Sequence, residues 1–288
     1  MDKLDTIKQG MQAQADTDSQ VLDMWLHGRS PHTQKAYRQD VAQFAEYVGV
    51  GIREVTLPAL QAYSDSLAEL ADSSINRKLS AVKSLLSFAH RMGYTPFNVG
   101  APLRSPKVKN TLAERILSEA EVQRVIALEP NPRNRVLLTL LYASGGRVSE
   151  VCGLKWKDAQ ERKDGGQVTL FGKGGKTRAV LLSASTWTAL QSIRGDGADD
   201  DPVFRSRVGQ GHLDASQLHR IVRAAARRAG VKANVSPHWF RHAHASHALD
   251  RGCPIHLVQA TLGHASVATT GKYIHARPTE SSAKYLAV

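Results

Sequence analysis

Apolar residues recur at helical spacing along most of the chain, so the pattern predicts a mainly α-helical protein. In the first third it predicts helices over residues 30–48, 57–70 and 74–91, and Gly93 is typical of a residue that ends a helix. Residues 1–20 are polar and follow no clear period. We therefore expect a flexible leader at the start of the chain.

The later part of the chain predicts more helices and one hairpin. Residues 168–171 and 177–182 have strand composition and flank a glycine-rich turn, which favours a β-hairpin. Ser118 opens a capping box before an apolar run. Further helices are predicted over 135–142, from 148 onward, and over 185–194, 215–229, 238–250, 255–261 and 266–273. The predicted fold class is mainly α with a small antiparallel β-sheet (α+β).

The chain of 288 residues is long enough for two domains. Residues 96–110 carry three prolines and several basic residues, a composition typical of an extended linker. We place the boundary between the domains near residue 110. The predicted organisation is a leader over 1–20, a helical domain over 21–105, a linker over 106–112 and a mixed domain over 113–288.

The distribution of charge indicates a polyanionic partner. The formal net charge is +12, and no acidic residue occurs from Ser73 to Asn110, whereas Asp214 is the only one from Pro202 to Leu249. Two nearly one-signed stretches are typical of surfaces that face nucleic acid, although a basic protein with solvated faces would share them. The candidate DNA contacts are Arg77, Lys78, Lys83, Arg104, Lys107, Lys176, Arg178, Arg223 and Arg227.

Several classes of protein are disfavoured by the same sequence. No apolar run reaches the length of about 18 residues that a membrane span needs, and the first residues lack the build of a secretory signal. Cys152 and Cys253 are the only cysteines, too few for a disulfide framework or a four-cysteine zinc site. We expect a soluble cytoplasmic protein without a membrane partner.

Candidate chemistry lies in basic residues next to glycines. Arg147 follows Gly145-Gly146 at a predicted helix start, His238 and Arg241 share one helical face, and His264 precedes Tyr273 by nine residues. Guanidinium groups grip phosphate oxygens and keep their charge at any working pH. Taken singly, each residue has an ordinary structural explanation: Arg147 could be a surface arginine at a helix start, and Tyr273 could be a packed tyrosine. Together they favour chemistry on a phosphate.

A zinc site is the competing interpretation of the histidines at 238, 242, 244 and 247. Arg241 lies among them and would repel a cation, so we expect no metal. His242, His244 and His247 are interpreted as helix packing residues or neighbours of the phosphate.

Four segments resemble the motifs of tyrosine site-specific recombinases, the phage-integrase family, and the layout resembles its Xer-like members. The segments are YASGGRVSEVCGL, FGKGGKTRAVLL, SPHWFRHAHASH and LGHASVATTGKYIH, and they occur in the family's order. Residues 30–105 resemble the family's helical, SAM-like core-binding domain. The resemblance therefore covers nearly the whole chain and implies that residues 113–288 form the catalytic domain.

The resemblance implies a role for each motif residue. Arg147 and Arg241 would grip the scissile phosphate, while His238 and His264 would hydrogen-bond to it and handle protons near the nucleophile. Glu150, one helical turn beyond Arg147, would hold the site together.

Two further residues would make and break bonds. Tyr273 would attack the phosphate and form a 3′-phosphotyrosyl bond, and Lys173 would protonate the leaving 5′ oxygen. Lys176 and Arg178 compete for the lysine's role, which the family pattern gives to Lys173. Because the covalent intermediate keeps the energy of the phosphodiester bond, rejoining would need no ATP. Since the arginines would clamp the phosphate and the lysine would supply the proton, neither a metal nor any other cofactor would be needed.

The resemblance also implies the partners. They are double-stranded DNA with inverted-repeat recombination sites and three further copies of the chain in a tetramer on two duplexes, to which residues 281–288 would contribute by docking into a neighbour. A second recombinase or an accessory protein would fit the same scheme. Two alternatives remain open, a non-catalytic helix-turn-helix regulator built on residues 255–273 and a type IB topoisomerase. A regulator, however, has no use for Arg147, Lys173 and Arg241.

Overall fold

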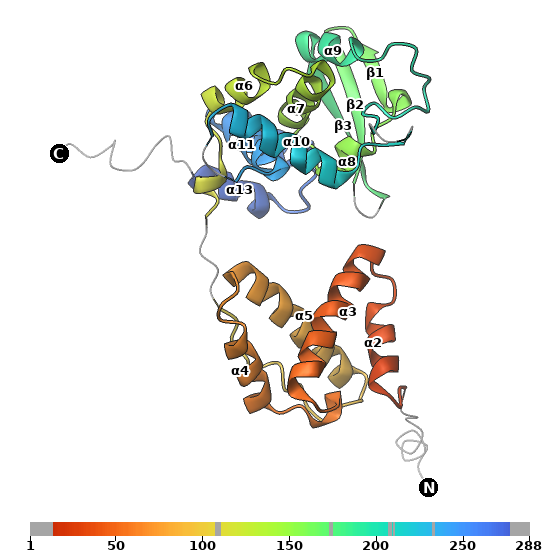
Figure 1. Cartoon of the computed structure of the whole chain (residues 1–288), viewed down its shortest axis with the longest axis vertical. Helices are drawn as coiled ribbons and strands as arrows, with labels where there is room; N and C mark the ends of the chain where they lie inside the picture. Colours follow the sequence, from red (N-terminus) through yellow and green to blue (C-terminus); the bar gives the residue numbers. More distant parts are fainter. Residues whose placement is uncertain are drawn as a thin grey trace, which may run out of the picture. The chain divides into compact units, whose positions relative to one another are not determined.

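The computed structural model describes residues 14–106, 111–172, 175–206, 209, 211–231 and 234–276. Contacts between residues divide the chain into two compact units, Met1–Lys109 and Asn110–Val288, and Figure 1 labels most of their helices and strands.

All the regular secondary structure among the described residues of the first unit is helical. Helix α3 packs against α2, α4 and α5, and a short 3₁₀ helix, η1, lies between α3 and α4. Side-chain caps explain where three of these helices begin, because Thr17, Ser30 and Thr56 each accept a hydrogen bond from a backbone N–H in the first turn. The bounds are α2 Asp18–Leu26, α3 Pro31–Val48, η1 Ile52–Glu54, α4 Leu57–Ser66 and α5 Asp72–Arg91.

Two predictions for this unit need correction. Helix α2 begins at Asp18, so the leader predicted over residues 1–20 extends too far. Thr17 and Gln20 form a reciprocal capping box there, and Trp25 is buried. The helix predicted over 57–70 ends at Ser66 instead.

The second unit combines helices with a three-stranded antiparallel sheet of order β1-β2-β3. In Figure 1 the strands lie at the right of this unit and α6, α11 and α13 at the left, with α7 between them. The predicted fold class, mainly α with a small antiparallel sheet, is confirmed. The elements are η2 Ala113–Arg115, α6 Glu119–Ala127, α7 Pro132–Ser144, α8 Val148–Cys152, η3 Trp156–Asp158, β1 Ala159–Arg162, β2 Gly165–Phe171, β3 Thr177–Ser183, α9 Ala184–Gln191, α10 Ala215–Arg228, α11 Pro237–Asp250, α12 Ile255–Leu262 and α13 Val267–Ala276.

The predicted hairpin is strands β2 and β3, whose register pairs Val168 with Val180 and Phe171 with Thr177. The sequence pattern does not predict strand β1, because its residues are polar and mostly exposed and lack the alternation that signals a half-buried strand. The chain between these two strands includes Lys173, for which the family resemblance implies a role.

The core of the second unit forms around α7. Four of its leucines, at positions 137, 138, 140 and 141, are at most 1% exposed. They belong to one apolar cluster with Val168 and Leu170 of the sheet and Phe240 of α11. A smaller cluster joins Ile116, Ala245, Val258, Leu262 and Tyr273. This smaller cluster fixes α11, α12 and α13 to one another and so positions the residues of the candidate site.

Candidate active site

Residues distant in the sequence meet where the glycine turn after α7 approaches the end of α12. Arg241 on α11 donates one hydrogen bond to the Gly145 carbonyl and another to the Leu262 carbonyl, each 2.6 Å long. Arg147, at the start of α8, donates to the Gly263 carbonyl at 3.3 Å. The two predicted arginines therefore converge on the α7–α8 and α12–α13 turns.

Arg241 is an almost fully buried guanidinium, 3% exposed. Burial lowers its pKa to about 10, and the nearby charges of Arg147 and Arg178 act in the same direction. At that value it still carries its charge at neutral pH. A concentrated, partly desolvated positive charge is well suited to bind a phosphate.

Glu150 holds two arginines in place. Its carboxylate accepts hydrogen bonds from the Arg147 backbone N–H at 2.7 Å and from Arg147 Nη1 at 2.8 Å. Arg178 on β3 adds two more, at 2.8 and 2.7 Å. The Arg178 Nε donates to the Thr261 carbonyl at 2.5 Å, so this side chain also anchors the end of α12.

The carboxyl of Glu150 stays ionised far into the acid range. Burial would raise its pKa, but the hydrogen bonds from Arg178 and Arg147 outweigh burial and hold the pKa at about 2. The side chain is 0% exposed. Removing the carboxylate should be strongly destabilising, because the Arg178 side chain, 11% exposed, and the half-buried Arg147 would lose the charge that neutralises them.

We predict that Glu150→Gln lowers the free energy of unfolding at pH 7 by about 3 kcal/mol, since the amide carries no charge and its NH2 group cannot accept the hydrogen bonds that Oε2 receives from the Arg147 backbone and from Arg178. The folded-state pKa of Glu150 lies below the unfolded one, so its contribution is present above pH 4.5 and is lost as the pH falls toward 2. The difference in free energy of unfolding between wild type and variant, measured by urea unfolding, should therefore shrink as the pH falls from 4.5 toward 2.

The matched control is Glu119→Gln, which removes the carboxylate of a surface pair with Arg251. We expect this variant to unfold close to wild type at every pH. A pH-independent gap for Glu150→Gln would contradict the assignment of charge pairing to this carboxyl.

Gly145 lets Leu262 of α12 and His244 of α11 pack closely against the turn after α7. Its φ is +56°, and a Cβ there would lie 2.7 Å from the Leu262 side chain and 2.9 Å from His244. A larger residue would therefore combine backbone strain with a steric clash at the site.

We predict that Gly145→Ala destabilises the protein by about 2 kcal/mol or more, of which about 1 kcal/mol is backbone strain. Gly195→Ala is the control, because Gly195 has a φ of +52° and nothing lies within 4 Å of the position that a Cβ would take there. In a thermal or urea melt, Gly195→Ala should lose only the stability that backbone strain accounts for. Equal losses in the two variants would mean that the turn relaxes around the added methyl group.

Tyr273 lies buried on α13, 6% exposed, within the smaller apolar cluster. Its hydroxyl is 2.9 Å from Nδ1 of His242, and its ring is parallel to that of His264 with the centroids 6.5 Å apart. Burial raises the pKa of the phenol, an effect that the charge of Arg241 opposes. The tyrosine is therefore neutral in the protein alone.

His264 follows the left-handed Gly263 that ends α12. Its Nδ1 lies 2.9 Å from the hydroxyl of Thr270, a residue with no exposed surface. Burial and the charges of Arg241, Arg147 and Arg178 lower its pKa to about 4, so the imidazole is neutral at pH 7. Thr270 fixes the ring by one nitrogen and leaves the other for a ligand.

The histidines of α11 have separate partners. The His238 ring stacks on His242 with centroids 5.7 Å apart, whereas His244 Nδ1 lies 2.8 Å from the Tyr142 carbonyl and His247 Nδ1 lies 2.9 Å from the Tyr142 hydroxyl. Within the part of the chain that the structure describes, no group of three or more His, Cys, Asp or Glu residues is arranged to hold a metal ion.

An open cavity of about 610 Å³ lies beside these residues. Its lining includes Arg147, Lys176, Arg178 and His264. A basic wall of this kind suits a phosphodiester. The predicted Lys173, in the turn between β2 and β3, lies outside the described residues, as do residues 281–288.

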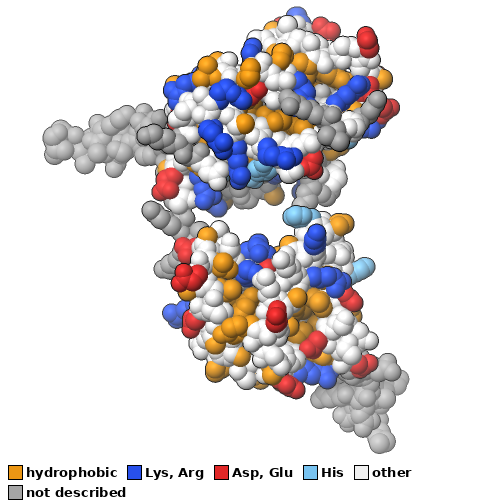
Figure 2. Space-filling model, in the orientation of Figure 1, with side chains coloured by type: hydrophobic (Ala, Val, Ile, Leu, Met, Phe, Trp, Pro, Cys, Tyr) orange, Lys and Arg blue, Asp and Glu red, His pale blue; other side chains and the backbone are white. Residues whose placement is uncertain are grey.

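Some of the predicted DNA contacts are exposed to solvent, whereas others are bonded within the protein. Arg104, Lys176, Arg223 and Arg227 are exposed, whereas Lys107 lies outside the described residues. Arg77 and Lys78 pair with the buried Asp40, and Lys83 donates to the Leu103 carbonyl. Arg178 was predicted as a DNA contact, yet all three of its guanidinium nitrogens bond within the protein. Figure 2 shows further lysines and arginines on the visible face of each unit.

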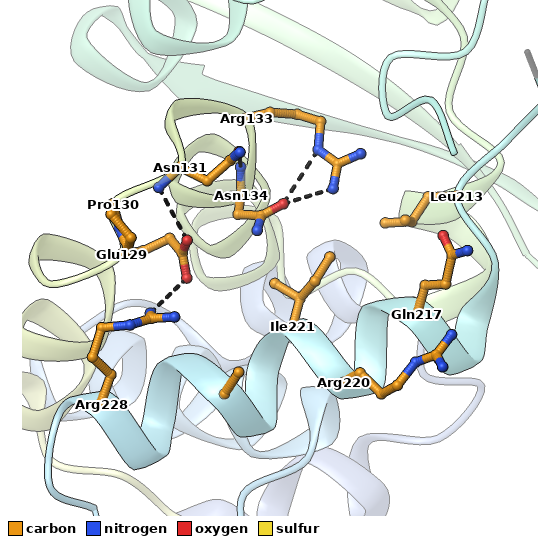
Figure 3. Close-up of a pocket in the computed structure, with 11 residues that line it drawn as sticks. Glu129, Pro130, Asn131, Arg133, Asn134, Leu213, Gln217, Arg220, Ile221 and Arg228 are labelled. Carbon is orange, nitrogen blue, oxygen red and sulfur yellow. Dashed lines mark hydrogen bonds and ion pairs between the residues drawn. The ribbon is translucent and has the colours of Figure 1, made fainter. Parts of the chain in front are cut away.

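A second cavity, of about 540 Å³, lies between α10 and the start of α7 (Figure 3). Its wall contains an ion pair of Glu129 with Arg228 at 2.8 Å and the contact of Arg133 with Asn134. None of the motif residues lines it. We therefore assign the chemistry to the cavity beside Arg147.

Among the residues described, no helix is both long and apolar enough to span a bilayer.

Comparison with known proteins matches both units. The model of the Phage integrase family matches residues 115–280, and that of the Phage integrase, N-terminal SAM-like domain, matches residues 23–93. Tyrosine recombinase XerC of Xylella fastidiosa (strain 9a5c) is 34% identical over 260 residues, which cover 86% of this chain and 87% of that protein.

Solved structures agree on the fold. The XerA recombinase structure is 27% identical, with a TM-score of 0.52, and the match covers 93% of this chain and 96% of XerA. A lambda integrase tetramer bound to a Holliday junction has a TM-score of 0.74 at 17% identity, covering 96% of this chain and 82% of the integrase.

Proposed function

The chain belongs to the phage integrase family of tyrosine recombinases, and we propose that it recombines specific DNA sites through a 3′-phosphotyrosyl intermediate on Tyr273, without metal or ATP. It is thus an enzyme that breaks and rejoins DNA. The observation that carries the proposal is the convergence of Arg147 and Arg241 on the turn after α12, where His264 lies with its ring parallel to that of Tyr273.

The charges explain how the site would stabilise the transition state. Arg147 and Arg241 would neutralise the non-bridging oxygens of the scissile phosphate, a task that metal ions perform in many other phosphoryl-transfer enzymes. Backbone carbonyls already hold both guanidinium groups, and Glu150 also holds that of Arg147. Little reorganisation would then be needed when DNA binds.

The proposed bond changes balance without an external energy source. Tyr273 Oη gives its proton to a neighbouring histidine and forms a bond to phosphorus, the bond from phosphorus to the 5′ oxygen breaks, and Lys173 gives that oxygen a proton. In rejoining, a 5′ hydroxyl attacks the phosphotyrosine and Tyr273 leaves. The number of phosphoester bonds is unchanged, so ATP is not required.

We assign Arg178 a positioning role in place of the predicted DNA contact. Its paired bonds to Glu150 orient the carboxylate that in turn orients Arg147. The remaining basic candidates, such as Arg223 and Arg227 on α10, would contact the DNA backbone.

The proposed partners are duplex DNA with inverted-repeat sites and three further copies of the chain. Support comes from the lambda integrase tetramer, which is bound to a Holliday junction and shares the fold. Two duplexes must be held together for strands to be exchanged, which a single copy could not do. The two units would both bind the same duplex.

The regulator and topoisomerase alternatives leave more unexplained. Helices α12 and α13 do meet at Gly263, as in a helix-turn-helix, but this turn carries His264 to the ring of Tyr273. A DNA-binding regulator would gain nothing from that arrangement. The family match favours recombination over relaxation of supercoils by a topoisomerase.

A suicide-substrate assay tests the proposal. The recombination site is first isolated by selecting bound duplexes from a random library, and a nick is then placed so that the cleaved end diffuses away. We expect a covalent protein–DNA adduct on a denaturing gel in excess chelator, with the DNA mapped to Tyr273 by mass spectrometry. An adduct on another residue, or strict dependence on magnesium, would overturn the proposal.

Affinity for DNA should depend steeply on salt. Because the proposed contacts are mainly to phosphates, we expect the dissociation constant to rise by about 100-fold or more between roughly 50 and 200 mM salt. Fluorescence anisotropy with the isolated site measures this directly. A flat response would argue against phosphate contacts as the main source of affinity.

A further inference from the structure

We infer that His242 is a further catalytic residue, the base that takes the proton from Tyr273 Oη as that oxygen attacks the phosphate. The inference rests on the proposed function and deepens it. The sequence suggests only packing or a phosphate neighbour for this histidine. Its Nδ1 lies 2.9 Å from Tyr273 Oη, within hydrogen-bonding reach of the reacting atom.

The geometry favours His242 over His264 as the base. The His264 ring is parallel to the Tyr273 ring, with an angle of 3° between the planes, and its Nδ1 is occupied by Thr270. A parallel ring presents its face rather than a nitrogen. The His242 ring, by contrast, is tilted by 47° and directs a nitrogen at the hydroxyl.

His238 is better placed as a neighbour of the base than as the base itself. Its ring stacks on His242, with centroids 5.7 Å apart and planes 17° apart. Stacking places His238 against the face of the His242 ring, whereas the Tyr273 hydroxyl meets that ring at its Nδ1. This leaves His238 for the phosphate, as the family resemblance implies.

The protonation state of His242 suits an acceptor. Burial lowers its pKa to about 4, and the charges that face it act in the same direction, from His238 and Arg241 on α11, Arg115 on η2 and His264 on the α12–α13 turn. The imidazole is therefore neutral at pH 7. A neutral imidazole offers one bare nitrogen, and a phenol is a strong donor to it.

The proton transfer would be driven by the bound DNA. In the protein alone, an imidazolium at His242 would be repelled by Arg241 and Arg115. A phosphate held by the arginines offsets these charges and makes protonated His242 less costly. The proton then moves from Oη to Nδ1 while the new bond to phosphorus forms, and it returns to Oη when the 5′ hydroxyl displaces the tyrosine.

Two substitutions separate a base from a positioning group. His242→Asn places an amide oxygen near the Nδ1 position, so it can hold the hydroxyl but cannot take the proton. His242→Ala can do neither. If His242 is the base, both variants should cleave the suicide substrate about 100-fold more slowly than wild type at pH 7 and saturating DNA.

Alkaline pH and a more acidic phenol at position 273 should restore the cleavage rate of these two variants. Without a base the rate follows the fraction of phenolate, so it should rise about tenfold per pH unit below the phenol pKa, more steeply than in wild type. Fluorotyrosine at position 273 has a more acidic phenol and should speed the two variants far more than wild type. A substrate with a 5′-bridging sulfur keeps the leaving group from limiting any of these rates.

His256→Asn is the matched control, because His256 is an exposed histidine of the same unit and is outside the site. If His242→Asn cleaves at nearly the wild-type rate, His242 is not the base and has only a positioning role. Unchanged cleavage by both variants, or loss that neither pH nor fluorotyrosine relieves, would equally overturn it. DNA binding and thermal melts identify a variant that has not folded, in which case His242→Gln takes its place.

The outcomes keep this inference distinct from the proposed function. If the wild-type protein forms no adduct on Tyr273, the proposed function fails. If wild type forms the adduct and the His242 variants do so at the same rate, only the role of His242 fails.

Discussion

Tyr273→Phe should fold and bind its DNA site as wild type does, and yet form no covalent adduct at all. The substitution keeps the ring, which packs with Ile116, Val258 and Leu262, and removes the single oxygen. That oxygen is bonded to His242 Nδ1 at 2.9 Å. Loss of one hydrogen bond should cost only about 1 kcal/mol of stability.

The measurement is the suicide-substrate assay with Tyr273→Phe beside Tyr142→Phe. Tyr142 also carries a hydroxyl bonded to a histidine of α11, His247 at 2.9 Å, but lies outside the proposed machinery. Tyr142→Phe should therefore form the adduct. Adduct formation by Tyr273→Phe would refute the assignment of the nucleophile, whereas loss in both variants would point to a damaged α11.

Residues whose signal is local could be predicted from the sequence. Arg147 follows a glycine pair, which predicts its position at a helix start. His238 and Arg241 lie three residues apart, which predicts that they share one face of a helix. The hairpin is predicted by its apolar alternation and its glycine turn. These features depend on contacts within a few residues, which the chain order displays directly.

The roles of Arg178 and His242 could not be predicted, because their partners are far away along the chain. Arg178 meets Glu150 from 28 positions away, and His242 meets Tyr273 from 31 positions away. A basic residue in a strand and a histidine in a helix carry no mark of such contacts. The capping box of Thr17 and Gln20, by contrast, is a local signal, so the start of α2 could have been predicted.

Lys173→Ala should slow cleavage of normal DNA by about 1,000-fold at neutral pH, since an alkoxide leaves poorly without a proton. The tyrosine and the two arginines remain, so the variant should still bind the site. The informative substrate has sulfur in place of the 5′ bridging oxygen, because a thiolate leaves without help. With it, Lys173→Ala should cleave at nearly the wild-type rate, and Tyr273→Phe should remain inactive.

Lys176→Ala distinguishes the two lysines of the hairpin motif. Lys176 is exposed on the wall of the cavity beside Arg147, where it can attract phosphate but would not protonate the leaving oxygen. Its loss should weaken binding and slow both substrates by the same factor. Lys173→Ala alone should show a large ratio between the sulfur and oxygen substrates. If Lys176→Ala instead shows the large ratio between the sulfur and oxygen substrates, the general acid is Lys176. If the sulfur substrate rescues neither variant, the proton for the 5′ oxygen comes from outside the hairpin.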